Sequence, residues 1–405
     1  MPHAHPRRLL ALAASLLLLP GCAHAWPEAV ERSLALAGEN RAELQEVLRH
    51  YESLEDPLRL RAAEFLIANM EGHGYSVAVL RDAQGADIPY EALDYANFKE
   101  ALAALEAIEA ERGSVDFKRQ RFDADLEVMT ADFLIENIDL AFQAWREKPW
   151  ARGLSFDAFC EYVLPYRGSN EPLDHWRAAC LERYGHLPTT LEDAADAKAA
   201  AKWLQGDVHR WVRFREIFYL HPTDQSFSEM DQRGAGRCED ISNMIGYALR
   251  ANAIPCASDY TPYWANRDNN HAWEVILDEN GEGRAGLSNV AAKIYRKTFA
   301  LQRDNLAFKL AEGEKAPRWL MGKSYKDVTN QYLDTTDVTV ELTEPAPEGA
   351  RFAYLCVFNG GEVGDTAAHV VEGDPVAFDF TPVNAAPLAA IEHAEVGEAS
   401  ALGGG

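Results

Sequence analysis

The segment Gly236–Asn252, GRCEDISNMIGYALRAN, constrains the fold of this chain more than any other. Its apolar residues recur at the spacing of one helix face, at Ile241, Ile245, Ala248 and Leu249. The segment therefore predicts a helix that runs to about Asn252, with Cys238 in or just before its first turn. Free backbone N–H groups and the positive end of the helix dipole stabilise a thiolate there and lower its pKa. Cys238 is either such a nucleophile or a small buried residue at the start of a core helix.

A second pattern places a histidine in a defined context. Ile254 and Pro255 end the helix, and an extended piece follows from Ala257 to Pro262. The residues after Asn270, HAWEVIL, then alternate as a strand that His271 opens at its loop end. A side chain at that position can face a cleft, although a single histidine is also a common core residue.

A cysteine–histidine pair needs a third group that holds the imidazole in the correct tautomer. After the turn 278–283, the residues 284–288 are predicted to form the next strand, and Asn289 stands at its end. Asn289 is therefore the favoured third residue. Asp278 and Glu282, which are nearer in sequence to the histidine, remain alternatives.

Taken together, these motifs resemble the core of the transglutaminase-like superfamily over about residues 220–299. The similarity lies in G-x-C-E-D at Gly236–Asp240, a helix containing L-R-A, then I-P, then H-A-W-E-V at His271–Val275. The resemblance implies a papain-like fold in which the cysteine helix packs on an antiparallel sheet. It also implies that Cys238 is the nucleophile and His271 the general base and acid. Asn289 stands near the position where that family usually has Asp.

The chemistry implied by the resemblance is acyl transfer through a thioester, on a peptide, protein or glycopeptide substrate and without a cofactor. The backbone N–H of Cys238 and the side chain of Gln232 are candidate oxyanion donors. Aromatic residues near the predicted cleft are candidates for a substrate wall, or for core: Tyr260, Tyr263, Trp264 and Trp273. No metal-ligand spacing is apparent. The alternative is an inactive surface binding or structural lipoprotein that keeps the fold.

The sequence pattern along the rest of the chain predicts an α+β protein with a helical N-terminal region. The predicted units are a leader at 1–21, a helical region at 22–200, the transglutaminase-like core with an antiparallel sheet at 201–320, a small β-sandwich at 324–385 and a disordered tail at 386–405. Helical periodicity marks the ranges 41–70, 98–108, 132–145 and 173–181. Three residues in the helical region, Tyr166, Arg167 and Glu171, are either support-layer residues or the lining of a cleft.

The N-terminus predicts export. Arg7 and Arg8 precede an apolar run from Leu9 to Leu19, which is too short to span a bilayer. The following LPGC resembles a lipobox, so Cys22 is expected to carry a lipid that anchors the protein in the bacterial cell envelope. Cleavage after Ala25, which would release the protein, is the alternative. No later segment is apolar over a membrane-spanning length.

The net charge and the cysteine content limit which partners and which disulfides are expected. The formal net charge of −25 argues against nucleic acid as a partner. Without Cys22, five cysteines remain, and an odd number leaves at least one thiol unpaired. Cys160 and Cys180 are close enough in sequence for a disulfide to be considered.

Overall fold

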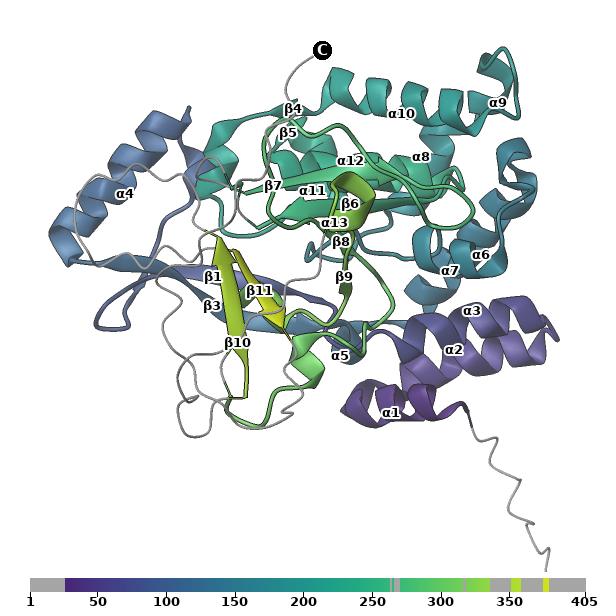
Figure 1. Cartoon of the computed structure of the whole chain (residues 1–405), viewed down its shortest axis with the longest axis horizontal. Coiled ribbons are helices and arrows are strands. Elements are labelled where there is room, and N and C mark those ends of the chain that lie inside the picture. The colour runs from purple at the N-terminus through teal and green to yellow at the C-terminus, as the bar shows by residue number, and fades with distance from the viewer. Residues whose placement is uncertain are drawn as a thin grey trace, which may run out of the picture.

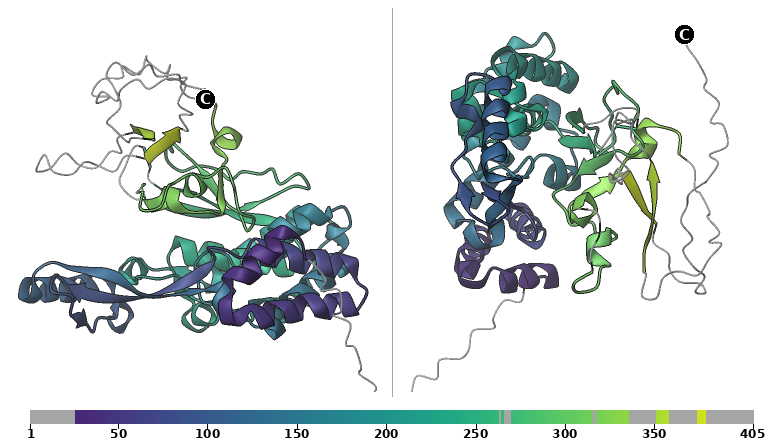
Figure 2. Two further views of the ribbon diagram at one scale, coloured as in Figure 1. Left: turned by 90° about the horizontal axis from the view of Figure 1, so that it is seen from below. Right: turned by 90° about the vertical axis from the view of Figure 1, so that its left-hand side faces the viewer.

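The computed structural model describes residues 26–262, 264–265, 270–314, 316, 318–335, 351–357 and 374–378. Several predictions lie outside these residues: the leader, the lipidation of Cys22, Tyr263, much of the β-sandwich at 324–385 and the tail at 386–405. Within them the protein is α+β, with a broad layer of helices packed against a smaller layer of antiparallel strands (Figures 1 and 2).

The helical layer contains most of the N-terminal half of the chain. Its helices are α1 (Glu28–Leu36), α2 (Arg41–Ser53), α3 (Pro57–Ala68), α4 (Phe98–Arg112), α5 (Asp125–Val128), α6 (Ala131–Glu147), α7 (Phe156–Tyr162), α8 (Trp176–Tyr184), α9 (Leu187–Thr190) and α10 (Ala197–Trp211). The predicted helices are present, but the periodic stretch 41–70 is two helices. Asp56 separates them because its carboxylate accepts the Arg59 N–H and caps α3, whose first residue is Pro57.

A three-stranded antiparallel sheet interrupts this region, which the sequence analysis treated as mostly helical. It contains β1 (Gly74–Asp82), β2 (Asp87–Ile88) and β3 (Val115–Ala124) in the order β2-β1-β3. The ribbon formed by β1 and β3 extends, together with α4, to one side of the molecule (Figure 1). β3 alternates Val, Phe and charged residues and is largely exposed, so it lacks the apolar run of a core strand. The β-branched residues Val77 and Val79 in β1 are the signal that could have revealed it.

The second sheet carries the predicted core. Its strands are β6 (Cys256–Thr261), β7 (His271–Ile276), β8 (Tyr295–Lys297) and β9 (Tyr325–Asp327), antiparallel in the order β7-β6-β8-β9. The helices around it are α11 (Phe227–Arg233), α12 (Cys238–Ala251) and α13 (Thr329–Tyr332). A short parallel pair, β4 (Arg213–Phe214) and β5 (Ala235–Gly236), precedes α12. The predicted strand at 284–288 is wrong, because those residues form no strand.

The two faces of this sheet have different neighbours. Cys256 and Ile276, which pair in register, pack into the cluster that contains α12, α10 and α8. Trp273 and Val275 belong to another cluster, which includes Trp264. Because side chains alternate along a strand, α12 covers the face of β7 that carries Ala272, Glu274 and Ile276.

The last described strands are β10 (Ala353–Val357) and β11 (Asp374–Phe378), which pair antiparallel within the range of the predicted β-sandwich. β9 pairs with β8, so the predicted boundary at 320–324 is followed directly by a strand of the core sheet.

Two further predictions are tested by the described residues. Cys160 and Cys180 form no disulfide; both are free and buried, and they belong to different core clusters. No helix among the described residues combines the length and apolarity needed to cross a membrane.

Candidate active site

The first turn of α12 is held by its own sequence. Asp240 is buried, and its carboxylate accepts the backbone N–H groups of Arg237 at 2.9 Å and Gln225 at 3.0 Å, as well as the Gln225 Nε2 at 3.1 Å. Gly236 is required beside it, because a Cβ there would lie 2.5 Å from the Asp240 Cβ. The Arg237 guanidinium in turn pairs with Asp224. These contacts hold the backbone on both sides of Cys238 in place.

Cys238 is the first residue of α12 and is half-buried. The backbone N–H groups of Ala272 and Glu239 donate to its Sγ. Cys238 therefore lies against β7 at the residue that follows His271. The two predicted motifs, which are far apart in sequence, are brought together as the pattern indicates.

The electrostatics of the thiol differ from the prediction of a lowered pKa. Burial raises the pKa of Cys238, and this effect exceeds the opposing effect of the N–H groups of Ala272 and Glu239. The nearby Glu239 carboxylate also raises it. The helix start is present, but the cost of burying a thiolate outweighs the stabilisation that the helix start supplies. The resting thiol is therefore protonated at neutral pH.

His271 lies on the face of β7 opposite α12. Its ring is 5.4 Å from the ring of Trp273 and 5.8 Å from that of Trp264, measured between centroids. Burial lowers the pKa of His271, while the Glu239 carboxylate raises it. The ring makes no hydrogen bond to Cys238 or to any other described residue. Cys238 and His271 thus lie at the same edge of the sheet. Both side chains are neutral, and no hydrogen bond links them.

None of the three predicted orienting residues contacts His271 among the described residues. The Asn289 side chain donates to Ser288 Oγ at 3.2 Å. The Asp278 carboxylate caps its own turn by accepting the N–H groups of Asn280 and Glu282. The carbonyl of the adjacent Val290 accepts the Ala265 N–H at 2.8 Å, next to Trp264 in the sequence.

Glu239, which is not among the predicted site residues, is the carboxylate that acts on the pKa of His271. Its side chain binds the Nζ of Lys297 on β8. The signal for Glu239 was present in the sequence as the residue after the cysteine in G-x-C-E-D. The position of Lys297 depends on the sheet order, so no local pattern could reveal it.

The predicted oxyanion glutamine is not at the thiol. Gln232 is exposed on α11. The buried glutamine nearby is Gln225, whose Nε2 is bound to the Ala235 carbonyl and to Asp240. The backbone N–H of Cys238, the other predicted donor, has no hydrogen-bond partner within the described part of the chain.

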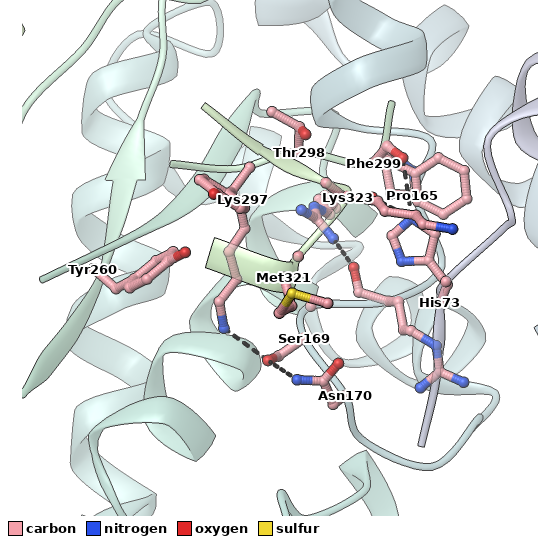
Figure 3. Close-up of a pocket in the computed structure, with 17 residues that line it drawn as sticks. His73, Pro165, Ser169, Asn170, Tyr260, Lys297, Thr298, Phe299, Met321 and Lys323 are labelled. Atoms are coloured by element: carbon pink, nitrogen blue, oxygen red, sulfur yellow. Dashed lines mark hydrogen bonds between the residues drawn. The ribbon is translucent and has the colours of Figure 1, made fainter. Parts of the chain in front are cut away.

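The described residues of the predicted aromatic wall lie on opposite faces of the sheet. Trp264 and Trp273 are buried and stacked with a centroid separation of 6.2 Å, and the Trp273 Nε1 donates to the Tyr332 hydroxyl. They form core beside His271. Tyr260 lies on the other face of the sheet, where it lines a cavity of about 300 Å³ (Figure 3).

The same cavity accounts for the residues proposed for a cleft in the helical region. Arg167 lines it. Tyr166 and Glu171 are buried beside it: the Tyr166 hydroxyl binds Asp125, and the Glu171 carboxylate accepts the N–H groups of Gly168 and Ser169. One of the three predicted cleft residues therefore faces the space, and the other two support it.

No family model, curated protein or solved structure matches this chain. Among the described residues, no cluster of three or more His, Cys, Asp or Glu side chains could hold a metal ion. The chemistry of the site therefore has to be inferred from its own residues.

Proposed function

We propose that the protein is a cysteine enzyme with a transglutaminase-like core that acts on amide bonds through a thioester. The observation that carries this proposal is the contact between the Cys238 Sγ, at the start of α12, and the N–H of Ala272, next to His271. A nucleophile and a base from two separate motifs thus lie at one edge of one sheet. Their sequence contexts also resemble that family.

The proposed reaction consists of an acylation, which forms the thioester, and a deacylation, which breaks it. The thiol proton of Cys238 passes to His271 as the Sγ–C bond forms at the substrate carbonyl. The same proton then passes to the amine as the C–N bond breaks, which leaves a thioester. Water or a second amine displaces the thiol and gives hydrolysis or cross-linking. The free N–H of Cys238 is suited to stabilise the oxyanion of each tetrahedral intermediate.

The resting geometry sets one requirement for this mechanism. The His271 ring has to turn from the two tryptophans toward the Cys238 Sγ when substrate binds. Glu239 would then stabilise the imidazolium, because a negative charge nearby favours the protonated ring. The third residue of the site is therefore either Glu239, or one of Asn289, Asp278 and Glu282 after a local rearrangement.

The proposed setting is the bacterial cell envelope, with the protein tethered through Cys22, or secreted if the leader is cleaved after Ala25. The strands β10 and β11 support the further proposal that residues 324–385 contain a small β-sandwich beside the core.

A second candidate is a binding or structural lipoprotein that has lost turnover. It is favoured by the raised pKa of Cys238 and by the stacking of His271 among tryptophans. The protein would then keep the fold and a binding surface but would catalyse no reaction.

The test is turnover of casein and of cell-wall peptides, with ammonia release and incorporation of a fluorescent primary amine measured together. We expect loss of activity in Cys238→Ala and His271→Ala, and an acyl-enzyme on Cys238 detectable by mass spectrometry. A Cys238→Ala protein with full amide hydrolysis contradicts the mechanism. Glu239→Gln, Asn289→Ala and Asp278→Ala identify the third residue by the largest fall in rate with the fold intact.

A further inference from the structure

The cavity of about 300 Å³ between the helical layer and the sheet has an unusual lining. Its described residues include four cationic side chains, Arg167, Arg250, Lys297 and Lys323, and no Asp or Glu. The chain as a whole carries a net charge of −25, so this lining does not follow from its composition. Tyr260 and Lys297 lie on one side of the space, and His73, Phe299 and Lys323 on the other (Figure 3).

Two of the cations keep unused donors. Arg167 is 4% exposed; its Nε and Nη2 bind Asp125, but its Nη1 has no partner among the described residues. Arg250 is 9% exposed; its Nη1 binds the Arg167 carbonyl, and its Nε has no partner. Arg250 also forms no ion pair with any described residue. Buried guanidinium groups are normally paired, so Arg250, which lines the cavity, would be compensated by an anion bound there.

The two lysines extend the positive lining toward the rim. Lys323 pairs with Glu71 at 2.6 Å, and Lys297 pairs with Glu239 and donates to Ser169 Oγ at 2.7 Å. Burial opposes the charge of Lys297, but the Glu239 and Asp224 carboxylates raise its pKa overall. None of these acids is among the described residues that line the cavity, and Arg250 is the cation of the lining that has no ion-pair partner among the described residues.

The cavity begins beside the proposed nucleophile. Lys297 binds Glu239, the residue after Cys238, and Tyr260 pairs in register with Ala272, whose N–H contacts the thiol. Arg250 lies twelve residues along the same helix, about 18 Å from Cys238 at 1.5 Å per residue. An extended peptide of about five residues spans roughly that distance.

We propose that this cavity is an anion subsite for a carboxylate of the peptide substrate, a few residues from the amide carbonyl that Cys238 attacks. The inference rests on the proposed function, because it assumes that Cys238 meets a peptide. The arginines would bind the carboxylate through charge-assisted hydrogen bonds. The apolar part of the terminal residues would contact Tyr260, Phe299 and Met321.

The test uses two thiol-reactive probes of equal length, iodoacetyl-tetraalanine with a free carboxylate and the same peptide as its amide. The rate constant for alkylation of Cys238 is measured by mass spectrometry at low ionic strength. We expect the acid to label Cys238 about tenfold faster than the amide. In Arg250→Gln the ratio should approach one, and Arg250→Lys should restore part of it. Arg210→Gln, which removes an exposed cation elsewhere, should leave the ratio unchanged.

Arg250 is buried, so its variants are checked by circular dichroism. If Arg250→Gln does not fold, Lys323→Gln at the rim serves instead, with an expected fall of about threefold. Equal labelling by both probes in the wild type overturns the proposal. Equal labelling combined with inhibition by inorganic phosphate assigns the cavity to a free anion and overturns it too.

The labelling needs no turnover, so the two proposals can fail separately. A protein that prefers the acid probe but hydrolyses no amide retains the subsite and loses the proposed function. A protein that hydrolyses acid and amide peptides equally, and labels equally with both probes, retains the function and loses the subsite.

Discussion

Replacing Gly236 by Ala tests how the start of α12 positions Cys238. The new Cβ would lie 2.5 Å from the Asp240 Cβ and 2.9 Å from its Oδ2. Asp240 is 1% exposed and accepts hydrogen bonds from Gln225 and Arg237, so it cannot move without loosening them. Overpacking costs about 1–3 kcal/mol, and a weakened hydrogen bond to a buried carboxylate about 1.5–3 kcal/mol. We expect a loss of about 3–5 kcal/mol.

The same helix offers the matched control. A Cβ added at Gly246 meets nothing within 4 Å, so Gly246→Ala should stabilise by about 0.5–1 kcal/mol through helix propensity alone. Urea denaturation followed by circular dichroism measures both changes. Iodoacetamide labelling of folded Gly236→Ala should also be faster at Cys238, because the thiol leaves its half-buried position. Equal stability of Gly236→Ala and wild type, or equal destabilisation by both variants, would refute the reasoning.

Four further predictions concern the site, the core and the anchor. The midpoint of the pH profile for iodoacetamide labelling of Cys238 should lie above that of free cysteine, because burial raises its pKa and labelling follows the thiolate. Glu239→Gln should shift this midpoint to lower pH by removing a like charge; an upward shift contradicts this. Arg296→Met should destabilise by about 3–5 kcal/mol in urea, because Asp259 stays buried without its bidentate partner, whereas Arg296→Met with Asp259→Leu should recover much of the loss. Cys22→Ser should move the protein from the membrane fraction to the soluble fraction, and an unchanged distribution argues against the lipid anchor.

Local pattern predicted the elements of the site well. The helix expected from Cys238 to about Asn252 spans Cys238–Ala251, and the strand expected to open at His271 spans His271–Ile276. Both succeed because apolar periodicity and turn residues act within a few positions of each other. The ribbon of β1 and β3 was missed for the converse reason. β3 is largely exposed and carries charges on both sides, so it gives little hydrophobic signal, and only the short apolar run of β1 marks the ribbon.

The sequence by itself determined that a cysteine begins a helix and that a histidine begins a strand. Only the tertiary structure decided that the Cys238 Sγ meets the N–H of Ala272 while the His271 ring lies on the other face of the sheet. The strand period fixes which residues share a face, but the packing of α12 selects which face it covers. The same holds for the cavity, because Arg167, Arg250 and Lys297 come from three distant segments that only the layer packing brings together.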